Sequence, residues 1–378
     1  MLCGSLKAEN RAQERLKTGE SMFENRRKQL NQILEANGMQ AVIISGPSNL
    51  YYFTGFTGGE AFFVMLMGKG YIITDSRYYE QVEKECHELI LIRLESKSYS
   101  ETVKELFADF QDDVKVAVED DMNLSMYLKL CRICNNCTFQ LKGEEINSCR
   151  MIKDAEELEK IEKAEAIGDA AFSHILDMIK PGVTEAEIAL ELEFFMKKQG
   201  ASKLSFDTIV ASGANSSMPH AQVTGRRVEN GDFITMDFGC VYQGYCSDMT
   251  RTVAAGNPTE EMKKVYQIVL DANRRAMEQI AEGKKCSDID ALARDYIREK
   301  GYGAYFGHGL GHGVGLDIHE EPRFSPKCQV KTKENMAITV EPGIYLPGRF
   351  GVRIEDLVVV TKNGFKNLTH SEKELIIL

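Results

Sequence analysis

The sequence predicts two domains: an α/β domain over residues 1–149, followed by an α+β domain with an internal repeat over residues 150–378. Three observations support this organisation. A chain of 378 residues is long for one hydrophobic core and sufficient for two domains. Short apolar segments alternate with helical segments in the first part of the chain. In the second part, an apolar strand that ends at a carboxylate occurs twice.

The first domain is expected to hold a sheet with helices between its later strands. A helix ends at Gly38, since glycine is favoured directly after the last turn of a helix. Apolar segments then predict the strands, at residues 40–45, 62–67, 71–74, 89–94 and 114–119. Residues 1–20 are charged, and we expect a disordered or helical extension there, to which we assign no function. We find no motif in this domain that carries chemistry.

The second domain is expected to open with helices. Asp154 can cap a long charged amphipathic helix that runs to residue 181. Residues 184–187 form a capping box, and the helix that follows runs to residue 200. Two more helices are expected between residues 259 and 300. The change of pattern near residue 150 marks the domain boundary.

The second domain contains an internal repeat. A helix that ends at Gly200 corresponds to a second helix that ends at Gly301, and residues 229–237 then resemble residues 334–341. In each copy one carboxylate ends an apolar strand and a second carboxylate follows. The four carboxylates are Asp237 and Asp248 in the first copy, and Glu341 and Glu355 in the second. A duplicated fold with a site on its pseudo-twofold axis would bring all four together.

The charge and the apolar runs limit the partners of the chain. A formal net charge of −11 argues against a surface for nucleic acid or anionic membranes, because both carry negative charge themselves. The longest apolar run, residues 61–67, is far too short to span a bilayer. Residues 1–20 lack the apolar core of a secretory signal, so we expect a cytoplasmic protein.

The chain contains ten cysteines, four of which lie within residues 131–149. All ten are expected to be reduced thiols, since nothing in the sequence indicates export. Cys131, Cys134 and Cys137, followed by Cys149, contain two successive spacings that resemble an iron–sulfur or zinc site. The fourth cysteine nevertheless stands twelve positions on (149 − 137), and no proline follows it. We interpret the cluster as small residues on or beside a helix, with a metal cluster as the alternative.

The first pair of carboxylates, Asp237 and Asp248, indicates a metal site only in combination with further residues. Asp237 lies in an apolar strand, where a carboxylate is unfavourable unless it is paired or bound. Asp248 follows eleven positions later (248 − 237), so an antiparallel hairpin can bring the two face to face. They would repel each other there unless a cation lay between them. Taken alone, the pair favours a hydrogen-bonded turn or a salt bridge to Arg251.

The histidines shift this balance. Three of the seven lie in residues 307–319, where glycine occupies every second position from 307 to 315. Such a backbone offers little for packing, so close approach to a ligand explains these histidines better than a core does; a flexible surface loop is the alternative. One imidazole and four carboxylates suit manganese, cobalt or zinc. Four negative ligands balance two divalent cations, and paired metal ions activate water for amide hydrolysis.

In this order, Asp237, Asp248, His312, Glu341 and Glu355 resemble the ligand set of the pita-bread metallopeptidases, which include methionine aminopeptidase, prolidase and aminopeptidase P. The motifs cover residues 150–378, and the first domain resembles the extra N-terminal domain of the proline-specific branch. The resemblance implies a pita-bread (creatinase/aminopeptidase-like) catalytic domain and two divalent metal ions, manganese first and cobalt or zinc as alternatives. It implies that Asp248 and Glu355 bridge both ions. Asp237 would complete one ion, and His312 with Glu341 the other.

The same resemblance implies further catalytic and substrate-binding residues. Glu341 would shuttle a proton from the attacking water to the leaving nitrogen. His220 would contact the substrate near the scissile bond, and His319 would stabilise the oxyanion of the scissile carbonyl. His308 and Arg353 are similar to residues that line the proline side of the pocket and steady the negative charge. The simpler alternatives are a turn residue for His220, an ion pair with the next two residues for His319, a supporting role for His308 and a salt bridge to Asp356 for Arg353.

The resemblance implies an Xaa-Pro aminopeptidase, which acts on short peptides with proline at the second position. The first alternative is an Xaa-Pro dipeptidase (prolidase), which acts on dipeptides only, and the sequence does not measure the room beyond the proline that separates the two. From another class, the alternative is a metal-free peptide-binding pseudoenzyme, which the intact ligand set disfavours. A mononuclear iron oxygenase would leave the four carboxylates without a purpose. A homodimer is expected by resemblance.

Overall fold

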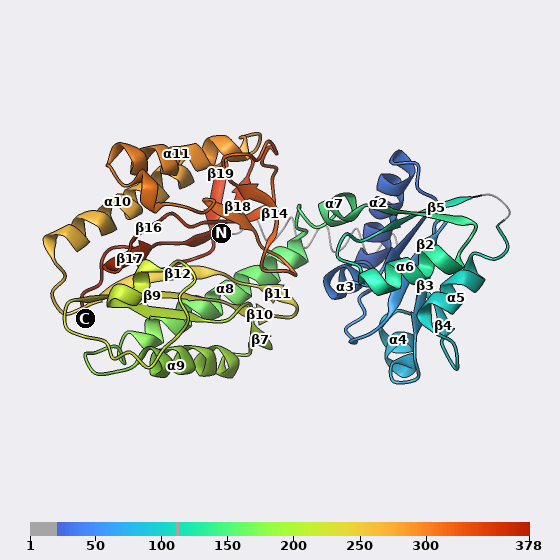
Figure 1. Cartoon of the computed structure of the whole chain (residues 1–378), viewed down its shortest axis with the longest axis horizontal. Helices are drawn as coiled ribbons and strands as arrows, with labels where there is room; N and C mark the ends of the chain where they lie inside the picture. Colours follow the sequence, from blue (N-terminus) through green and yellow to red (C-terminus); the bar gives the residue numbers. More distant parts are fainter. Residues whose placement is uncertain (1–20, 111–112) are drawn as a thin grey trace, which may run out of the picture. The chain divides into compact units, whose positions relative to one another are not determined.

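The computed structural model of the chain describes residues 21–110 and 113–378. The chain divides into two compact units between Arg150 and Met151 (Figure 1). The expected extension at residues 1–20 lies outside the described residues. Within the described part, no helix is both long enough and apolar enough to cross a membrane.

The N-terminal unit is built on a mixed six-stranded sheet with the strand order β4-β3-β2-β1-β5-β6. Its strands are β1 (Ala41–Ile44), β2 (Phe62–Leu66), β3 (Lys69–Thr74), β4 (Ile90–Arg93), β5 (Val114–Val118) and β6 (Cys137–Leu141). Its helices are α2 (Met22–Ala36), α3 (Pro47–Thr54), α4 (Tyr79–Glu85), α5 (Tyr99–Leu106), α6 (Leu124–Ile133) and α7 (Gly143–Ser148). All five predicted strands are confirmed. The edge strand β6 was missed, because only Phe139 of its five side chains is buried.

The first half of the second unit consists of two helices and their strands. The helices are α8 (Ala155–Ile175) and α9 (Glu185–Lys198), and the strands are β7 (Lys203–Leu204), β8 (Ile209–Ser212), β9 (Asp232–Phe238), β10 (Cys240–Tyr242), β11 (Tyr245–Cys246) and β12 (Met249–Ala255). The caps predicted at Asp154 and Thr184 are present. Helix α8 ends six residues earlier than predicted, because the amides of Met178 and Ile179 both bond to the Ile175 carbonyl in a tightened turn.

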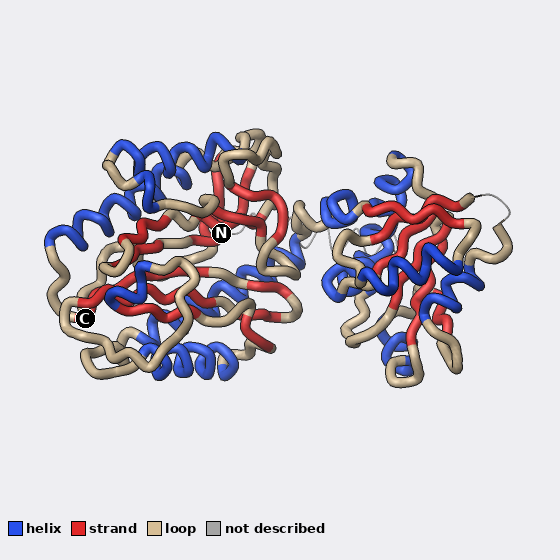
Figure 2. Tube along the Cα trace, viewed as in Figure 1, coloured by secondary structure: helices blue, strands red, loops and turns tan. Residues whose placement is uncertain are grey.

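The second half repeats this order of elements. Its helices are α10 (Glu260–Met277) and α11 (Cys286–Glu299), and its strands are β13 (Gly311–Gly313), β14 (Glu320–Phe324), β15 (Ala337–Val340), β16 (Gly343–Leu346), β17 (Phe350–Arg353), β18 (Asp356–Thr361) and β19 (Gly364–Asn367). Figure 2 shows the strands of this unit between the two pairs of helices. The largest sheet has the order β14-β13-β15-β18-β19, and a three-stranded sheet has the order β12-β9-β8.

Each half packs its helices on its own strands. In the first half, Ile167 and Leu192 of the two helices share a buried cluster with Val210 and Met236 of the strands. The side chains of β9 alternate as predicted: Ile234, Met236 and Phe238 all belong to this cluster, which leaves Asp237 on the opposite face. The second half has an equivalent cluster over α10, α11, β15 and β18. The polar faces of the two halves are therefore free to form a site.

Strand register places the carboxylates at matching strand ends. In the antiparallel pair of β9 and β12, Phe238 stands opposite Met249, so Asp237 and Asp248 lie at one end of the pair. In the antiparallel pair of β15 and β18, Val340 stands opposite Asp356, so Glu341 and Glu355 follow and precede these strands at one end. This is the duplicated arrangement that the sequence repeat predicts.

Gly311 allows β13 to approach β15 closely enough to bring His312 to the same place. A Cβ atom at position 311 would lie 1.9 Å from the carbonyl oxygen of Thr339. The approach is held by the amide of His312, which donates to Thr339 Oγ1 at 3.1 Å, and by the amide of Glu341, which donates to the Leu310 carbonyl at 2.7 Å.

The substitution Gly311→Ala should therefore lower the free energy of unfolding by about 1–3 kcal/mol, the usual range for overpacking a close contact. Gly307→Ala is the matched control, because a Cβ atom there meets nothing within 4 Å and the backbone is not left-handed. Urea unfolding followed by circular dichroism measures both. Equal stability of the two variants would show that β13 has room for a side chain.

Candidate metal centre and its cavity

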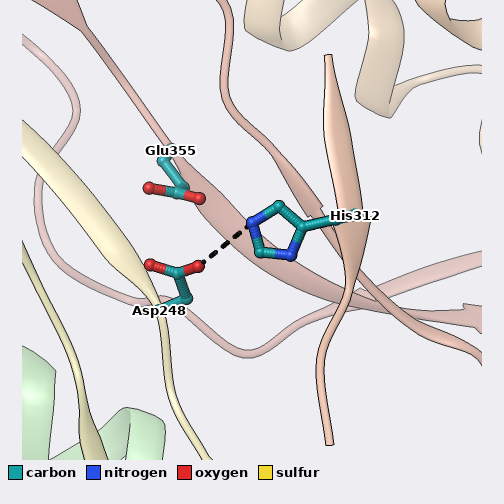
Figure 3. A group of neighbouring side chains, drawn as sticks. All are labelled: Asp248, His312 and Glu355. Carbon is teal, nitrogen blue, oxygen red and sulfur yellow. Dashed lines mark ion pairs between the residues drawn. The ribbon is translucent and has the colours of Figure 1, made fainter. Parts of the chain in front are cut away.

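The five predicted ligands come together on the walls of one cavity. Asp237, Asp248, His312, Glu341 and Glu355 all line a space of about 1090 Å³. Asp248, His312 and Glu355 are buried, and each offers a ligand atom within 4.8 Å of those of the other two (Figure 3). His312 Nε2 lies 3.4 Å from Asp248 Oδ2 and 3.5 Å from Glu341 Oε1.

The tautomer of His312 suits a cation. Its Nδ1 lies 3.1 Å from the Gly313 carbonyl oxygen, which can only accept, so Nδ1 carries the proton. Burial and the neighbouring His319 lower the pKa of His312 to about 3, so the ring is neutral near pH 7. The lone pair of Nε2 thus faces carboxylate oxygens, a contact that is repulsive unless a cation or a carboxyl proton lies between them.

The ionised forms of the carboxyl groups in this cluster are likewise unfavourable without a cation. Burial, and next the charge of Glu355, raise the pKa of Asp248 well above its usual value. Burial and Glu355 do the same to Glu341. Burial and Asp237 raise the pKa of Glu355 to about 8. Like charges gathered in a buried site shift the pKa values in this direction, and divalent cations reverse the effect.

Asp237 provides the clearest test of fit. Its Oδ2 accepts a hydrogen bond from Arg353 Nη2 at 2.5 Å, whereas its buried Oδ1 has no hydrogen-bond partner among the described residues. A buried acceptor without a partner is rare in proteins and calls for an explanation. A divalent ion held by Asp237 would satisfy this oxygen, so the residues present fit the implied metal.

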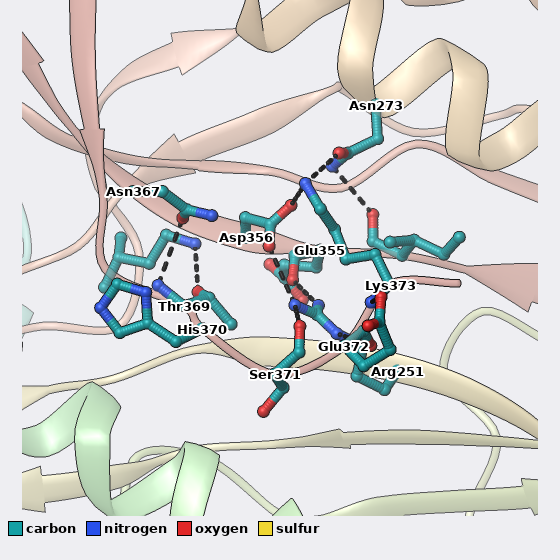
Figure 4. Close-up of polar contacts among 12 residues, drawn as sticks. Arg251, Asn273, Glu355, Asp356, Asn367, Thr369, His370, Ser371, Glu372 and Lys373 are labelled. Atoms are coloured by element: carbon teal, nitrogen blue, oxygen red, sulfur yellow. Dashed lines mark hydrogen bonds and ion pairs between the residues drawn. The ribbon is translucent and has the colours of Figure 1, made fainter. Parts of the chain in front are cut away.

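Two of the simpler alternatives do not hold. Arg251 forms no salt bridge with the aspartate pair; its Nη2 pairs with Asp356 Oδ1 at 2.9 Å, and its Nη1 donates to the Glu355 carbonyl (Figure 4). Arg353 pairs with Asp237 and not with Asp356. Arg353 ends β17 and Asp356 begins β18, and these two strands belong to different sheets.

A buried polar network holds the backbone behind the glutamates (Figure 4). Asn273 of α10 donates through Nδ2 to the carbonyl oxygens of Val340 at 2.9 Å and Ile354 at 3.5 Å, the residues before Glu341 and Glu355. Lys373 Nζ bonds to Asn273 Oδ1 at 3.0 Å and to Asp356 Oδ2 at 2.8 Å. Burial alone would raise the pKa of Asp356, but the positive charges of Arg251 and Lys373 outweigh this effect and hold the pKa below its usual value.

The predicted substrate residues line the same cavity. The rings of His319 and His312 are 4.4 Å apart, edge to face. Burial and Arg323 lower the pKa of His319. His220 is exposed at the cavity in the loop that follows β8. His308 is half-buried, and burial and Arg353 lower its pKa to about 4, so it is neutral near pH 7.

Tyr345 links His308 to the metal centre, and the sequence analysis missed it. His308 Nδ1 lies 2.8 Å from the Gly309 carbonyl and carries the proton, so the Tyr345 hydroxyl donates to His308 Nε2 at 3.0 Å. The same hydroxyl accepts from Arg353 Nη1 at 2.8 Å. Thr250 was also missed; it stands opposite Asp237 and donates to Glu355 Oε2 at 2.7 Å. Neither residue belongs to a recognisable sequence motif.

Three cysteines of the predicted cluster lie on or beside helix α6. Cys131 is exposed on α6, Cys134 caps that helix, and Cys137 begins β6, as the simpler interpretation expects. Across residues 21–110 and 113–378, the only group of three or more metal-type side chains is the one around His312. Every cysteine in the described part is a free thiol.

The fold and the site together are those of a metal-dependent hydrolase. Residues 159–362 match the model of metallopeptidase family M24, and residues 26–152 match the creatinase/prolidase N-terminal domain. The chain therefore belongs to metallopeptidase family M24. These matches confirm the predicted family and the predicted two-domain, pita-bread fold.

Three relatives illustrate the similarity. The chain is 39% identical over 361 residues to the Xaa-Pro dipeptidase of Pyrococcus furiosus, an alignment that covers 94% of this chain and 100% of the relative. The solved structure of the Xaa-Pro dipeptidase from Bacillus anthracis is 40% identical with a TM-score of 0.91, covering 94% of this chain and 100% of that chain. The X-Pro aminopeptidase from Thermotoga maritima MSB8 is 37% identical with a TM-score of 0.84, covering 92% and 100%.

Metal binding should release protons near pH 7. Because burial and the charge of Asp237 raise the pKa of Glu355 to about 8, this carboxyl group is largely protonated at pH 7 in the metal-free protein, and metal ions displace its proton. The affinity for Mn²⁺ should rise as the pH rises towards about 8, the pKa of Glu355, and proton release should cease well above it. Calorimetry in two buffers with different ionisation enthalpies measures the protons released. An affinity independent of pH across this range would contradict the assignment.

Asp248→Ala and Glu355→Ala should each abolish peptidase activity and the binding of paired metal ions, because each removes a buried carboxylate from the group that would hold the ions. Glu334→Ala is a suitable control, since it removes an exposed carboxylate that precedes β15. Metal content of the purified variants and a peptidase assay provide the readouts. Full activity in either cluster variant would refute the role of that carboxylate in metal binding.

Proposed function

We propose that this chain is an Xaa-Pro dipeptidase that uses two divalent metal ions, with manganese as the expected metal. The observation that carries the proposal is the position of Arg323 on the cavity that the five-residue cluster lines. A dipeptide has a free carboxylate on its proline, and the positively charged guanidinium of Arg323 can bind that group.

The relatives support the dipeptidase better than the aminopeptidase that the sequence analysis put first. Two of the three relatives described above have the name Xaa-Pro dipeptidase. The dipeptidase structure has a TM-score of 0.91, against 0.84 for the aminopeptidase structure. The relative from Thermotoga maritima is named as an aminopeptidase, so both specificities occur on closely similar folds. The choice therefore depends on how the cavity treats the end of the substrate beyond proline.

Arg323 is suited to a substrate carboxylate. It stands opposite His312 in the pair of β13 and β14, so the two side chains lie on the same face of the sheet. Among the described cavity residues it is one of two arginines, and the other, Arg353, is committed to Asp237 and Tyr345. The Nε of Arg323 lies 3.8 Å from the exposed Glu321, a loose pair that leaves its guanidinium available.

When bound, paired metal ions would polarise the scissile carbonyl and activate water, and Asp237, Asp248, His312, Glu341 and Glu355 would hold them. Glu341, whose pKa is raised, would accept a proton from the water and pass it to the leaving proline nitrogen. His220 would contact the substrate near the scissile bond, and His319 would stabilise the developing oxyanion of the scissile carbonyl. The intact ligand set makes a metal-free pseudoenzyme the weaker alternative.

Proline suits this site because an Xaa-Pro bond has no N–H group. The pocket therefore needs a shape for the ring and no acceptor for a scissile amide. His308, Tyr345 and Arg353 form a continuous hydrogen-bonded wall that could provide such a rigid shape. The homodimer expected by resemblance remains a prediction of the same proposal.

The proposal is tested by comparing three substrates that share the same Xaa-Pro part: the dipeptide Xaa-Pro, the amide Xaa-Pro-NH₂ and the tripeptide Xaa-Pro-Yaa. Each is assayed at saturating manganese. The dipeptide should have the highest kcat/KM. Arg323→Gln should lower kcat/KM for the dipeptide by about ten- to hundredfold, mainly through KM, because a charge-assisted bond is lost. The amide should change little, since it lacks the carboxylate.

Arg323→Lys serves as the matched control, because it keeps the positive charge and should retain more dipeptide activity than Arg323→Gln. Tripeptide turnover equal to or above that of the dipeptide would favour the aminopeptidase. An equal loss on the dipeptide and the amide in Arg323→Gln would remove the role in carboxylate recognition.

A further inference from the structure

Two buried acidic side chains outside the metal cluster hold loops that carry cavity histidines. Glu185, in the first turn of α9, is fully buried and accepts hydrogen bonds from both ends of the loop between β8 and β9. Asp290, in α11, is 1% exposed and together with Arg294 binds the loop before β13. We propose that these groups are the positioning residues for His220 and His308, one anchor in each half of the catalytic unit.

Glu185 closes the loop that carries His220. Its Oε1 accepts from the amide of Ser212 at 2.7 Å and from the Ser212 hydroxyl at 2.8 Å, where the loop leaves β8. Its Oε2 accepts from the amide of Thr224 at 3.1 Å and from the Thr224 hydroxyl at 2.6 Å, after His220. Asn215 Nδ2 donates to both carboxylate oxygens, at 3.2 and 3.0 Å. One carboxylate therefore fixes both ends of the segment.

These hydrogen bonds serve the loop and not the helix. The N-terminus of α9 already has a complete capping box, in which Thr184 and Glu187 exchange hydrogen bonds. A buried carboxylate without partners is strongly unfavourable, so the partners of Glu185 in the loop are also what permits its burial. Loop and anchor therefore depend on each other.

The middle of this loop is attached to the metal centre itself. Arg353 Nη1 donates to the Pro219 carbonyl at 3.2 Å, one residue before His220, while its Nη2 holds Asp237. The hydroxyl of Ser216 accepts from the amide of Gly351 at 2.9 Å. With both ends fixed by Glu185, these two contacts leave His220 little freedom relative to Asp237.

The second anchor acts on His308 in the same manner. Asp290 pairs with Arg294 through two contacts of 2.7 Å and accepts from the amide of Leu310 at 3.1 Å. The guanidinium of Arg294 then donates to the carbonyls of Phe306 at 3.1 Å and His308 at 2.7 Å. The backbone on both sides of the His308 ring is thus held from α11, the helix that occupies in the second half the place of α9 in the first.

The anchors matter because catalysis requires its groups to be placed within a fraction of an ångström. Neither carboxylate lines the cavity, so each influences the reaction through the backbone segment that it holds. This inference rests on the proposed function for its kinetic readout. It also predicts a local change in loop dynamics that needs no substrate.

Two crossed double-mutant cycles provide the test. Glu185→Gln places an amide group against partners that are all donors, and should lower kcat/KM for an Xaa-Pro dipeptide about tenfold, or about 1.4 kcal/mol. In a His220→Ala background the same change should cost less than about twofold, whereas in a His308→Ala background the tenfold loss should persist. Asp290→Asn should show the opposite pattern. Mn²⁺ affinity should remain within about twofold of wild type in the anchor variants.

Hydrogen exchange read by mass spectrometry gives the independent readout. Glu185→Gln should accelerate exchange in residues 212–224 and leave residues 306–310 unchanged, and Asp290→Asn should do the reverse. If Glu185→Gln does not fold, Thr224→Val removes the 2.6 Å contact alone and should give the same pattern with smaller size. Glu119→Gln is the matched control, because Glu119 is a buried carboxylate that holds the amides of Ser45 and Gly46 in the N-terminal unit.

The outcomes separate the two proposals. An equal loss of kcat/KM from Glu185→Gln with and without His220 would contradict the proposal that Glu185 positions His220. Unchanged hydrogen exchange in residues 212–224 would contradict it as well. A kinetic loss in Glu119→Gln as large as in Glu185→Gln would also overturn it, since general destabilisation would then suffice. If the wild-type protein hydrolysed no Xaa-Pro peptide, the proposed function would fail, while the exchange data would still decide whether the anchors hold their loops.

Discussion

Mutual repulsion among buried carboxylates is the constraint on which the rest of the catalytic unit depends. Burial raises the pKa values of Asp248, Glu341 and Glu355, the charges of neighbouring carboxylates raise them further, and the imidazole beside them presents a lone pair and not a proton. Such a group is unfavourable by itself, because burial removes the water that would screen it. Divalent cations turn the same arrangement into a stable site. The charges of the cluster are therefore balanced when it holds divalent metal ions.

The surrounding structure keeps these groups from moving apart. Strand pairs in two similar halves deliver the carboxylates to matching ends, and Gly311 permits the close approach that brings in His312. Behind the glutamates, Arg251 and Asn273 hold the adjoining backbone carbonyls. The proposed anchors, Glu185 and the Asp290–Arg294 pair, extend this principle from the metal ligands to the histidine loops.

The sequence was most informative where chemistry and pattern coincide. The five predicted ligands stood out because carboxylates interrupt apolar strands, histidines lie in a run of glycines, and their order resembles a known ligand set; the structure places all five on one cavity. Thr250, Tyr345 and Arg323 were not recognisable, because their positions depend on which residue stands opposite them across a strand pair or a cavity. Glu185 and Asp290 resembled ordinary helix residues for the same reason. The preference between dipeptide and longer peptide depends on cavity shape, which a sequence pattern does not encode.

The central claim is that five side chains of one family M24 chain hold two metal ions in this cavity. Diffraction from a manganese-soaked crystal, recorded at the manganese absorption edge, tests it most directly. The account predicts two anomalous peaks, both bounded by Asp237, Asp248, His312, Glu341 and Glu355, with Oδ1 of Asp237 directed at one of them. A single peak, or peaks bound elsewhere while these side chains satisfy one another, would contradict it.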